Sequence, residues 1–380
     1  MYRVILLYIS ILFTGFFTLG CAQQNNQVTY LFIGSYTDGA PADGIYIYKF
    51  NPSTGELTES GRVSHVTNPS FLTLSPNGKY LYASNESQLD KHGAVSAYRI
   101  DSVHGKLTFI NKQDAGGRNP VHVIVSADNK YVVNSNYTDP SVSFYSCNTD
   151  GSLQPAKAIY RYSGSSIVKG RQDESHIHSS IFTPDNKYIF SPDLGTDQIR
   201  VLKLKDGTLI KDPDHPDIKV SPGNGPRHFT FHPNGKFGYC VDELSGSVTV
   251  YAYEDGTLKK IESCKSYESN SGNYASADIH ISQDGRFLYA SNRTDENTIS
   301  VFSINKKTGK LNRIQVYPVF GNHPRSFVLS PDGNYLITAN QFSNNIVVLK
   351  RDPESGMLDK TDVELKIFHP SSLKMRTYSN

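Results

Sequence analysis

The chain has 380 residues, of which 37% are hydrophobic and 19% charged, and its formal net charge is +2. This length allows one large domain or two ordinary ones, and the near-neutral charge gives no support for a nucleic-acid partner. The 24 Tyr, 19 Phe, 29 Gly and 19 Pro residues supply strand and turn material, which is typical of an all-β globular protein.

The first predicted element is a secretory signal. Residues 4–20 read VILLYISILFTGFFTLG and follow Arg3, as the h-region of a signal follows its n-region. The stretch is short for a membrane span and has no stop-transfer flank. It ends in TLGC followed by AQQNNQ, which resembles a bacterial lipoprotein box except at Thr18, where Leu is usual. We predict a signal peptide over 1–20, lipidation of Cys21 and a tether over 21–27, with ordinary cleavage nearby as the alternative.

Three cysteines remain when Cys21 is set aside, at Cys147, Cys240 and Cys264. Their odd number and wide spacing predict neither a complete disulfide framework nor a metal site. We expect them to be free thiols in strands.

A strand–turn–strand unit recurs six times after the tether. Its turns, such as SPNGK, carry Asn, Asp and Gly, which accept the positive φ that hairpin turns require. The six copies begin at Asn68, Asn119, His176, Gly225, Ser276 and His323.

A second marker, Gly-x-Leu after a polar turn, occurs seven times, one more than the hairpin. Its copies lie at Gly55, Gly105, Gly151, Gly207, Gly256, Gly309 and Gly356. The mismatch is resolved at the termini, because TYLFIGSYT from Thr29 has no preceding strand and HPSSLKM from His369 has no following one. We therefore predict that the last strand completes the first sheet.

Seven four-stranded units closed in this way over residues 28–376 predict a seven-bladed β-propeller of the all-β class. No blade can bury both of its faces alone, so the ring must close to form its core. The absence of Trp excludes the WD40 subtype. A pair of β-sandwiches is the rival architecture, but it gives no reason for a marker that occurs seven times.

In a propeller the first strand of each blade lines the channel, and the second strand returns to the same mouth. Arg227 and His228, at the start of one strand, should therefore lie beside Asp242 and Glu243, at the end of the next. The same register brings to this mouth His122, His176, His178, Asp278 and Arg325 from strand starts, and Tyr36, Asn85, Glu86, Asn136, Asp193, Arg293 and Gln341 from strand ends.

Some of these residues have a structural explanation. The Asn or Asp that recurs at the end of the second strand, including Asp242, is expected to cap the following turn. His176 and His178 could share a metal, but no third ligand is specified by spacing, so we expect hydrogen-bonded or catalytic histidines and no metal or cofactor. His280 lies deeper in its strand and is expected to be a packed residue.

Several motifs carry a family likeness. GPRHFTFHPNGKFGYCVDEL, SADIHISQDGRFLYASNRT, HPRSFVLSPDGNYLITANQ and GSYT at Gly34 resemble the seven-bladed lactonase family, which includes propeller-type 6-phosphogluconolactonases and a fungal carboxymuconate cyclase. The likeness covers nearly all of the chain after residue 28. It implies hydrolysis of a sugar δ-lactone at the mouth, with matching positions at His178, Arg227, His228, Glu243, Asp278, Arg293, Arg325 and Gln341. The type substrate of the family, 6-phosphoglucono-lactone, is cytoplasmic, whereas this chain is predicted to be exported. Whether its substrate is phosphorylated therefore stays open.

No Ser-centred nucleophile elbow occurs, so we expect direct attack by water. Our hypothesis makes Glu243 or His178 the general base, with Arg227 and His228 stabilising the oxyanion. The residues expected to bind the substrate are Arg293 and Arg325, which would hold an anionic group, together with Asp278, Gln341 and Tyr36.

The predicted partner is a small anionic sugar lactone, and the predicted place is the periplasm or cell surface, with membrane contact only through the lipid on Cys21. Two alternatives remain open from the residues. One is a muconate-type lactonising or cycloisomerase enzyme, and the other is a non-catalytic surface propeller that binds a ligand.

Overall fold

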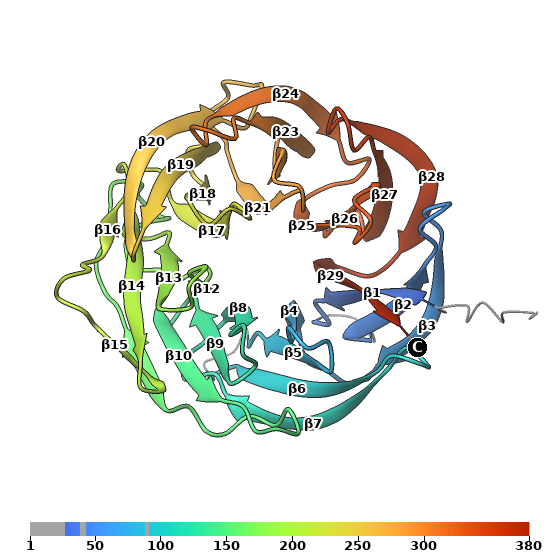
Figure 1. Cartoon of the computed structure of the whole chain (residues 1–380), viewed down its shortest axis with the longest axis horizontal. Coiled ribbons are helices and arrows are strands. Elements are labelled where there is room, and N and C mark those ends of the chain that lie inside the picture. The colour runs from blue at the N-terminus through green and yellow to red at the C-terminus, as the bar shows by residue number, and fades with distance from the viewer. Residues whose placement is uncertain (1–26, 39–42, 88–90, 380) are drawn as a thin grey trace, which may run out of the picture.

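The computed structural model describes residues 27–38, 43–87 and 91–379, and these form seven antiparallel sheets in a ring (Figure 1). Each sheet is one blade. The prediction of a seven-bladed β-propeller is confirmed. No helix among the described residues is long and apolar enough to cross a membrane.

The strands of each blade run in order from the central axis outward. Blade 1 contains β29 (Pro370–Ser379), β1 (Gln27–Ser35), β2 (Ile45–Phe50) and β3 (Leu57–Val63). Blade 2 contains β4 (Pro69–Leu74), β5 (Tyr80–Asn85), β6 (Ala94–Asp101) and β7 (Lys106–Asp114). Blade 3 contains β8 (Pro120–Val125), β9 (Tyr131–Asn136), β10 (Ser141–Ser146) and β11 (Ala158–Arg161). Blade 4 contains β12 (Ile181–Phe182), β13 (Tyr188–Asp193), β14 (Gln198–Lys205), β15 (Thr208–Ile210) and β16 (Ile218–Lys219). Both β15 and β16 pair with β14, at its two ends. Blade 5 contains β17 (Pro226–Phe231), β18 (Phe237–Asp242), β19 (Ser247–Glu254) and β20 (Thr257–Lys265). Blade 6 contains β21 (Ser276–Ile281), β22 (Phe287–Asn292), β23 (Thr298–Ile304) and β24 (Leu311–Pro318). Blade 7 contains β25 (Pro324–Leu329), β26 (Tyr335–Asn340), β27 (Asn345–Arg351) and β28 (Leu358–Lys366).

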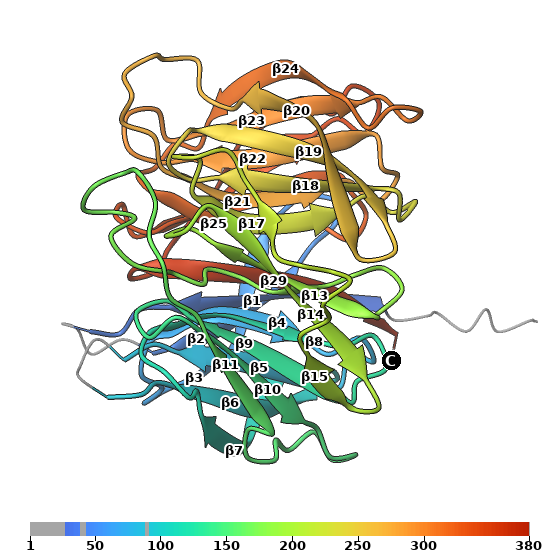
Figure 2. The same ribbon diagram turned by 90° about the vertical axis from the view of Figure 1, so that its left-hand side faces the viewer.

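The ring closes through the two ends of the described chain. Strand β29 pairs antiparallel with β1, with Leu31 opposite Met375 and Gly34 opposite Ser372, so the C-terminal strand completes blade 1 as predicted. Figure 2 shows the two strands lying side by side. Gln27 and Ser379 pair at one end of this ladder, and Ser35 lies at the other. The predicted signal peptide, Cys21 and nearly all of the tether lie outside the described residues.

The hydrophobic clusters lie between blades rather than within them. In one cluster Tyr239 and Val248 of blade 5 pack with Leu288 and Phe302 of blade 6, and all four are fully buried. This follows from the alternation of the strands, which points successive side chains to opposite faces of each sheet. Both faces must be covered by a neighbouring blade, so the core depends on closure of the ring.

The hairpin between the first two strands is built by one repeated polar motif. In blade 6 the Ser282 hydroxyl donates to Asp284 Oδ1 at 2.6 Å and accepts from the backbone N–H of Phe287 at 3.0 Å. Gly285, with φ +72°, supplies the positive φ of the turn. Equivalent motifs begin at Ser75, Ser126, Thr183 and Ser330.

The other end of the ring, where first strands begin and second strands end, is called the mouth here. Blade 4 departs from the repeat at this end, because β12 has only two residues and a single bridge joins Ile177 to Asp193. The Asp193 carboxylate accepts hydrogen bonds from the Ser175 hydroxyl at 2.7 Å and the His176 N–H at 2.8 Å, in place of ladder bonds. His176 and His178 therefore lie on an irregular segment and not on the regular strand that was expected.

Candidate functional site

One carboxylate, Glu243, contacts three arginines at the mouth. Arg227 Nε lies 2.8 Å and Arg293 Nη2 lies 2.9 Å from its Oε2, and Arg171 donates to its Oε1. The Arg227 N–H does not point along the line of a hydrogen bond, so that contact is an ion pair. Glu243 follows β18 directly, and Arg227 lies at the start of β17, so the hairpin brings them together as predicted.

The charges of this cluster do not balance. Burial would raise the pKa of the Glu243 carboxyl, but Arg293, Arg227 and Arg171 outweigh burial and lower that pKa to about 2. Burial, and then Arg293, lowers the pKa of Arg227 to about 9, so its guanidinium remains protonated at neutral pH. Three cations against one carboxylate leave this part of the mouth positive, as is needed to stabilise an anion.

Arg227 is also held by His228 and a backbone carbonyl. Its Nη1 lies 3.2 Å from His228 Nε2 and donates to the carbonyl of Ala277. On the other side of the His228 imidazole, Nδ1 lies 2.9 Å from Asp278 Oδ1. A carboxylate can only accept, so the imidazole carries its proton on Nδ1 and its Nε2 accepts from Arg227. Burial, and then Arg227, lowers the pKa of His228 to about 4, which keeps the ring neutral.

Asp278 is buried and surrounded by donors. Its Oδ2 accepts from the Ser326 hydroxyl at 2.9 Å and lies 3.2 Å from His280 Nε2, and its Oδ1 accepts from the N–H of Ile279 at 3.0 Å. Sequence reasoning expected Asp278 to contact the substrate. In the structure its oxygens contact His228, His280 and Ser326, and this arrangement orients the His228 ring.

His178 carries an unpartnered nitrogen. The side chain is 5% exposed, and its buried Nδ1 has no hydrogen-bond partner among the described residues. Burial, and then Arg227, lowers its pKa well below 6.5, so the imidazole is neutral. Its ring centroid lies 5.4 Å from that of Tyr137 and 5.5 Å from that of His228, which places it beside the arginine cluster.

A second carboxylate lies across the mouth. Glu86 Oε1 accepts from the Tyr36 hydroxyl at 2.8 Å, and Arg325 Nη2 lies 3.9 Å from the same oxygen. The Arg325 guanidinium also lies over the Tyr36 ring at 5.5 Å. A 3.9 Å ion pair is looser than the contacts of Glu243, so Arg325 is less tightly engaged than Arg227 or Arg293. Nearby, Gln341 has a buried Oε1 without a hydrogen-bond partner among the described residues.

Sequence reasoning missed three residues of the site. Tyr137 contacts His178 and stacks on His176, and it follows Asn136 at the register position that Glu243 occupies in blade 5, so the repeat could have revealed it. His323 precedes Pro324, where blade 7 begins, and its Nε2 lies 3.1 Å from Arg293 Nη1. Arg171 lies in the irregular segment before β12, where no repeat signal applies.

Asp242 belongs to the scaffold, as expected. Its carboxylate accepts from the hydroxyls of Thr249 and Ser247 and from the Asn224 amide, and these groups hold the loop after β18. Burial raises its pKa to about 6 despite these hydrogen bonds. The equivalent Asp193 in blade 4 is paired with Arg200 at 2.8 Å.

The family model described as "Lactonase, 7-bladed beta-propeller" matches residues 30–375. The chain belongs to this family. A 6-phosphogluconolactonase of Formosa agariphila is 49% identical over 353 residues, which are 92% of this chain and 100% of that protein. A 6-phosphogluconolactonase of Bacillus subtilis is 33% identical, over 90% of this chain and 97% of that one.

Solved structures give the same result for the fold. The periplasmic gluconolactonase PpgL of Pseudomonas aeruginosa superposes with a TM-score of 0.86 at 33% identity, over 92% of this chain and 99% of that one. The prediction of the propeller lactonase family is therefore confirmed across almost the whole described chain.

Proposed function

We propose that the protein hydrolyses a sugar lactone at the mouth of the propeller. The observation that carries this proposal is the neutral, unpartnered His178 beside three arginines that share one carboxylate. Lactone hydrolysis needs a group that accepts a proton from water and a cationic group for the oxyanion, and this cluster offers both. The names of the relatives, 6-phosphogluconolactonase and periplasmic gluconolactonase, support the same reaction class.

In the proposed mechanism His178 accepts a proton from a water molecule as the water oxygen attacks the lactone carbonyl. Arg227 stabilises the oxyanion of the tetrahedral intermediate. When the C–O bond of the ring breaks, the protonated His178 returns the proton to the leaving alkoxide. The products are an open-chain aldonate and the free hydroxyl group. The lowered pKa of His178 favours this second step, in which its imidazolium gives up the proton.

Glu243 is the weaker candidate for the base. The pKa values of both candidates are lowered, but three arginines engage the two oxygens of Glu243, whereas His178 Nδ1 has no hydrogen-bond partner among the described residues. We assign it the role of holding Arg171, Arg227 and Arg293 together. His228 then orients Arg227 through Nε2 rather than donating to the oxyanion itself, and Asp278 fixes the tautomer of His228.

Arg325 is the residue best placed to hold an anionic group of the substrate, because its only ion-pair partner among the described residues lies 3.9 Å away. We expect Arg325→Ala to weaken binding of 6-phosphoglucono-δ-lactone about tenfold, equivalent to about 1.4 kcal/mol. Glucono-δ-lactone, which has no phosphate, should be little affected. Steady-state KM values for both lactones check this, and equal losses would show that Arg325 supports the blade instead.

We also propose that the protein is exported and tethered through Cys21. The apolar residues 4–20 and the TLGC sequence support this, as does the periplasmic gluconolactonase among its structural neighbours. Intact-mass analysis of the native protein tests the proposal. Retention of Met1 on soluble protein would contradict it.

The test of the function is a panel of lactones with protein that starts after Cys21. The panel comprises glucono-δ-lactone, 6-phosphoglucono-δ-lactone and a muconolactone-type acid. Turnover of each compound is measured by proton release and by analysis of the products. We expect hydrolysis of at least one sugar lactone. Turnover of the muconate-type compound alone would favour the lactonising alternative, and no turnover at all would favour a ligand-binding propeller.

A further inference from the structure

Five blades are sealed against the next blade by the residue that follows their outer strand. This residue is buried, and its N–H donates to the carbonyl of the loop between the second and third strands of its own blade. The five residues are Ala115, Val220, Ser266, Val319 and Ile367. In three cases the next blade contacts the same residue, because Asn136, Asn292 and Asn340 donate from Nδ2 to its carbonyl.

The interface between blades 1 and 2 lacks this seal. The residue that follows β3 is Ser64, which is exposed and donates through its hydroxyl to Asp43. The Asn85 amide of blade 2 donates to the carbonyl of Thr67 instead, at 2.9 Å. At the interface between blades 3 and 4 the half-buried Tyr162 takes this place, and its N–H donates to the carbonyl of Pro140. Among the described residues, the interface between blades 1 and 2 alone has no such side chain, which leaves a space there.

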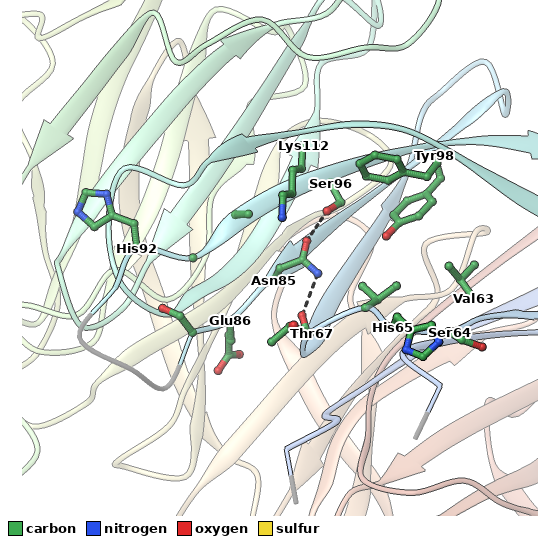
Figure 3. Close-up of a pocket in the computed structure, with 15 residues that line it drawn as sticks. Val63, Ser64, His65, Thr67, Asn85, Glu86, His92, Ser96, Tyr98 and Lys112 are labelled. Atoms are coloured by element: carbon green, nitrogen blue, oxygen red, sulfur yellow. Dashed lines mark hydrogen bonds between the residues drawn. The ribbon is translucent and has the colours of Figure 1, made fainter. Parts of the chain in front are cut away.

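A pocket of about 500 Å³ occupies this interface. Figure 3 shows Lys112, Ser96 and Asn85 in the middle of the pocket, with Glu86 and His92 on one side and His65 on the other. The Ser96 hydroxyl donates to Asn85 Oδ1 at 2.6 Å, and both oxygens retain a lone pair. Tyr98 and Phe109 supply an aromatic wall, with ring centroids 5.7 Å apart, and Phe109 is 54% exposed.

Glu86 connects this pocket to the mouth. It lines the pocket, and its Oε1 accepts from Tyr36 and faces Arg325. The pocket therefore begins one side chain away from the residue that we expect to hold the substrate, and it extends outward along blade 2.

We propose that this pocket binds a second sugar unit of the substrate, so that the preferred substrate class is a lactone joined to another sugar by a glycosidic bond. The inference rests on the proposed lactone hydrolysis. Pockets of 300–1,000 Å³ that combine an apolar wall with a few polar groups are the usual binding sites for small molecules. A sugar ring has a C–H face that suits Phe109 and hydroxyl groups that suit Asn85, Ser96 and Lys112.

The experiment compares kcat/KM for cellobiono-δ-lactone and glucono-δ-lactone. Two variants change the pocket: Ala94→Phe fills it, and Phe109→Ala removes the exposed ring of its aromatic wall. We expect the ratio of the two kcat/KM values, disaccharide over monosaccharide, to fall about tenfold in each variant. Val103→Ala, which removes an exposed apolar side chain outside the pocket on the same blade, should leave the ratio unchanged.

A ratio that is the same in all four proteins overturns the inference while the lactonase function stands. If the protein hydrolyses neither lactone, the proposed function fails first. Calorimetric titration with cellobionate and gluconate then provides the binding readout, because tighter binding of cellobionate that is lost in Ala94→Phe supports the pocket. Equal binding of both acids overturns it. Thermal unfolding of each variant establishes that the blades are intact.

Discussion

The two ends of the propeller are built by different rules. At the turn end one motif recurs, in which a hydroxyl contacts an Asp or Asn two residues later and caps the hairpin within a single blade. At the mouth the contacts join different blades, as when Glu243 of blade 5 pairs with Arg293 of blade 6. The repeated turn motif therefore acts within one blade, although single contacts such as Asn77 N–H to Asn129 Oδ1 also join blades at that end. The mouth combines charged residues that no single blade could bring together.

The turn end contributes to the stability of the fold, whereas the mouth carries the residues of the proposed reaction. The turn motifs pair a hydroxyl with an Asp or Asn at the edge of the molecule, as Ser282 pairs with Asp284. The mouth gathers buried like charges, which are costly and persist only where the surrounding structure fixes them. The pKa values of Glu243, His178 and His228 are lowered in buried positions at the mouth, whereas the lowered pKa of a turn carboxylate such as Asp284 belongs to a more exposed side chain.

The largest expected effect is loss of the ring itself. Deletion of the residues after Phe368 removes β29, the partner of β1, and exposes the faces of blades 1 and 7. We expect the whole propeller to lose its cooperative thermal transition, so that both ends fail together. A control that removes only Ser379 and Asn380 should unfold like the intact protein. A long deletion with an unchanged Tm would contradict closure by this strand.

The next effect separates the two ends. Glu243→Gln leaves Arg227 and Arg293 buried without their carboxylate, which should cost about 3–5 kcal/mol of the free energy of unfolding. Turnover should fall as well, because the arginines lose their common anchor. At the turn end, Ser282→Ala should cost only about 1 kcal/mol and leave kcat unchanged. Urea titration of both variants checks this, and a smaller loss in Glu243→Gln than in Ser282→Ala would reverse our account of the mouth.

A smaller effect concerns Asp242, which the repeat places beside the site. Burial raises its pKa from 3.8 to about 6, so the folded protein binds this proton more tightly than the unfolded chain does. Ionisation of Asp242 therefore lowers the free energy of unfolding. This loss is absent below about pH 4, grows as the pH rises toward 6 and reaches about 3 kcal/mol above pH 6.

Asp242→Asn should therefore stabilise the protein by about 2–3 kcal/mol at pH 8 and by little at pH 4. Asn already occupies this position in blades 3 and 6, at Asn136 and Asn292. Asp193→Asn provides the matched control, because its partner Arg200 would lose an ion pair and no such gain should follow. Unfolding free energies at the two pH values decide the matter, and an equal change at both would rule out titration of Asp242.

The repeat explains which parts of this account were accessible from the sequence. It predicted the ring, its closure and the meeting of Arg227 with Glu243, because these follow from strand order and one hairpin. It could not predict Arg171, which reaches Glu243 from an irregular segment outside the repeat. It could not predict the partners of Asp278 either, since only the structure shows that Ser326 of the next blade and His228 of the previous one engage its oxygens.

The central claim is that the mouth hydrolyses sugar lactones with His178 as the proton acceptor. The most direct measurement is the kcat of His178→Ala on glucono-δ-lactone at pH 7, corrected for spontaneous hydrolysis. We predict a kcat about 10²–10⁴-fold below that of the unaltered protein, with a similar Tm, because a buried neutral base has been removed without loss of a charge. A variant that keeps its fold and its full turnover would contradict the account.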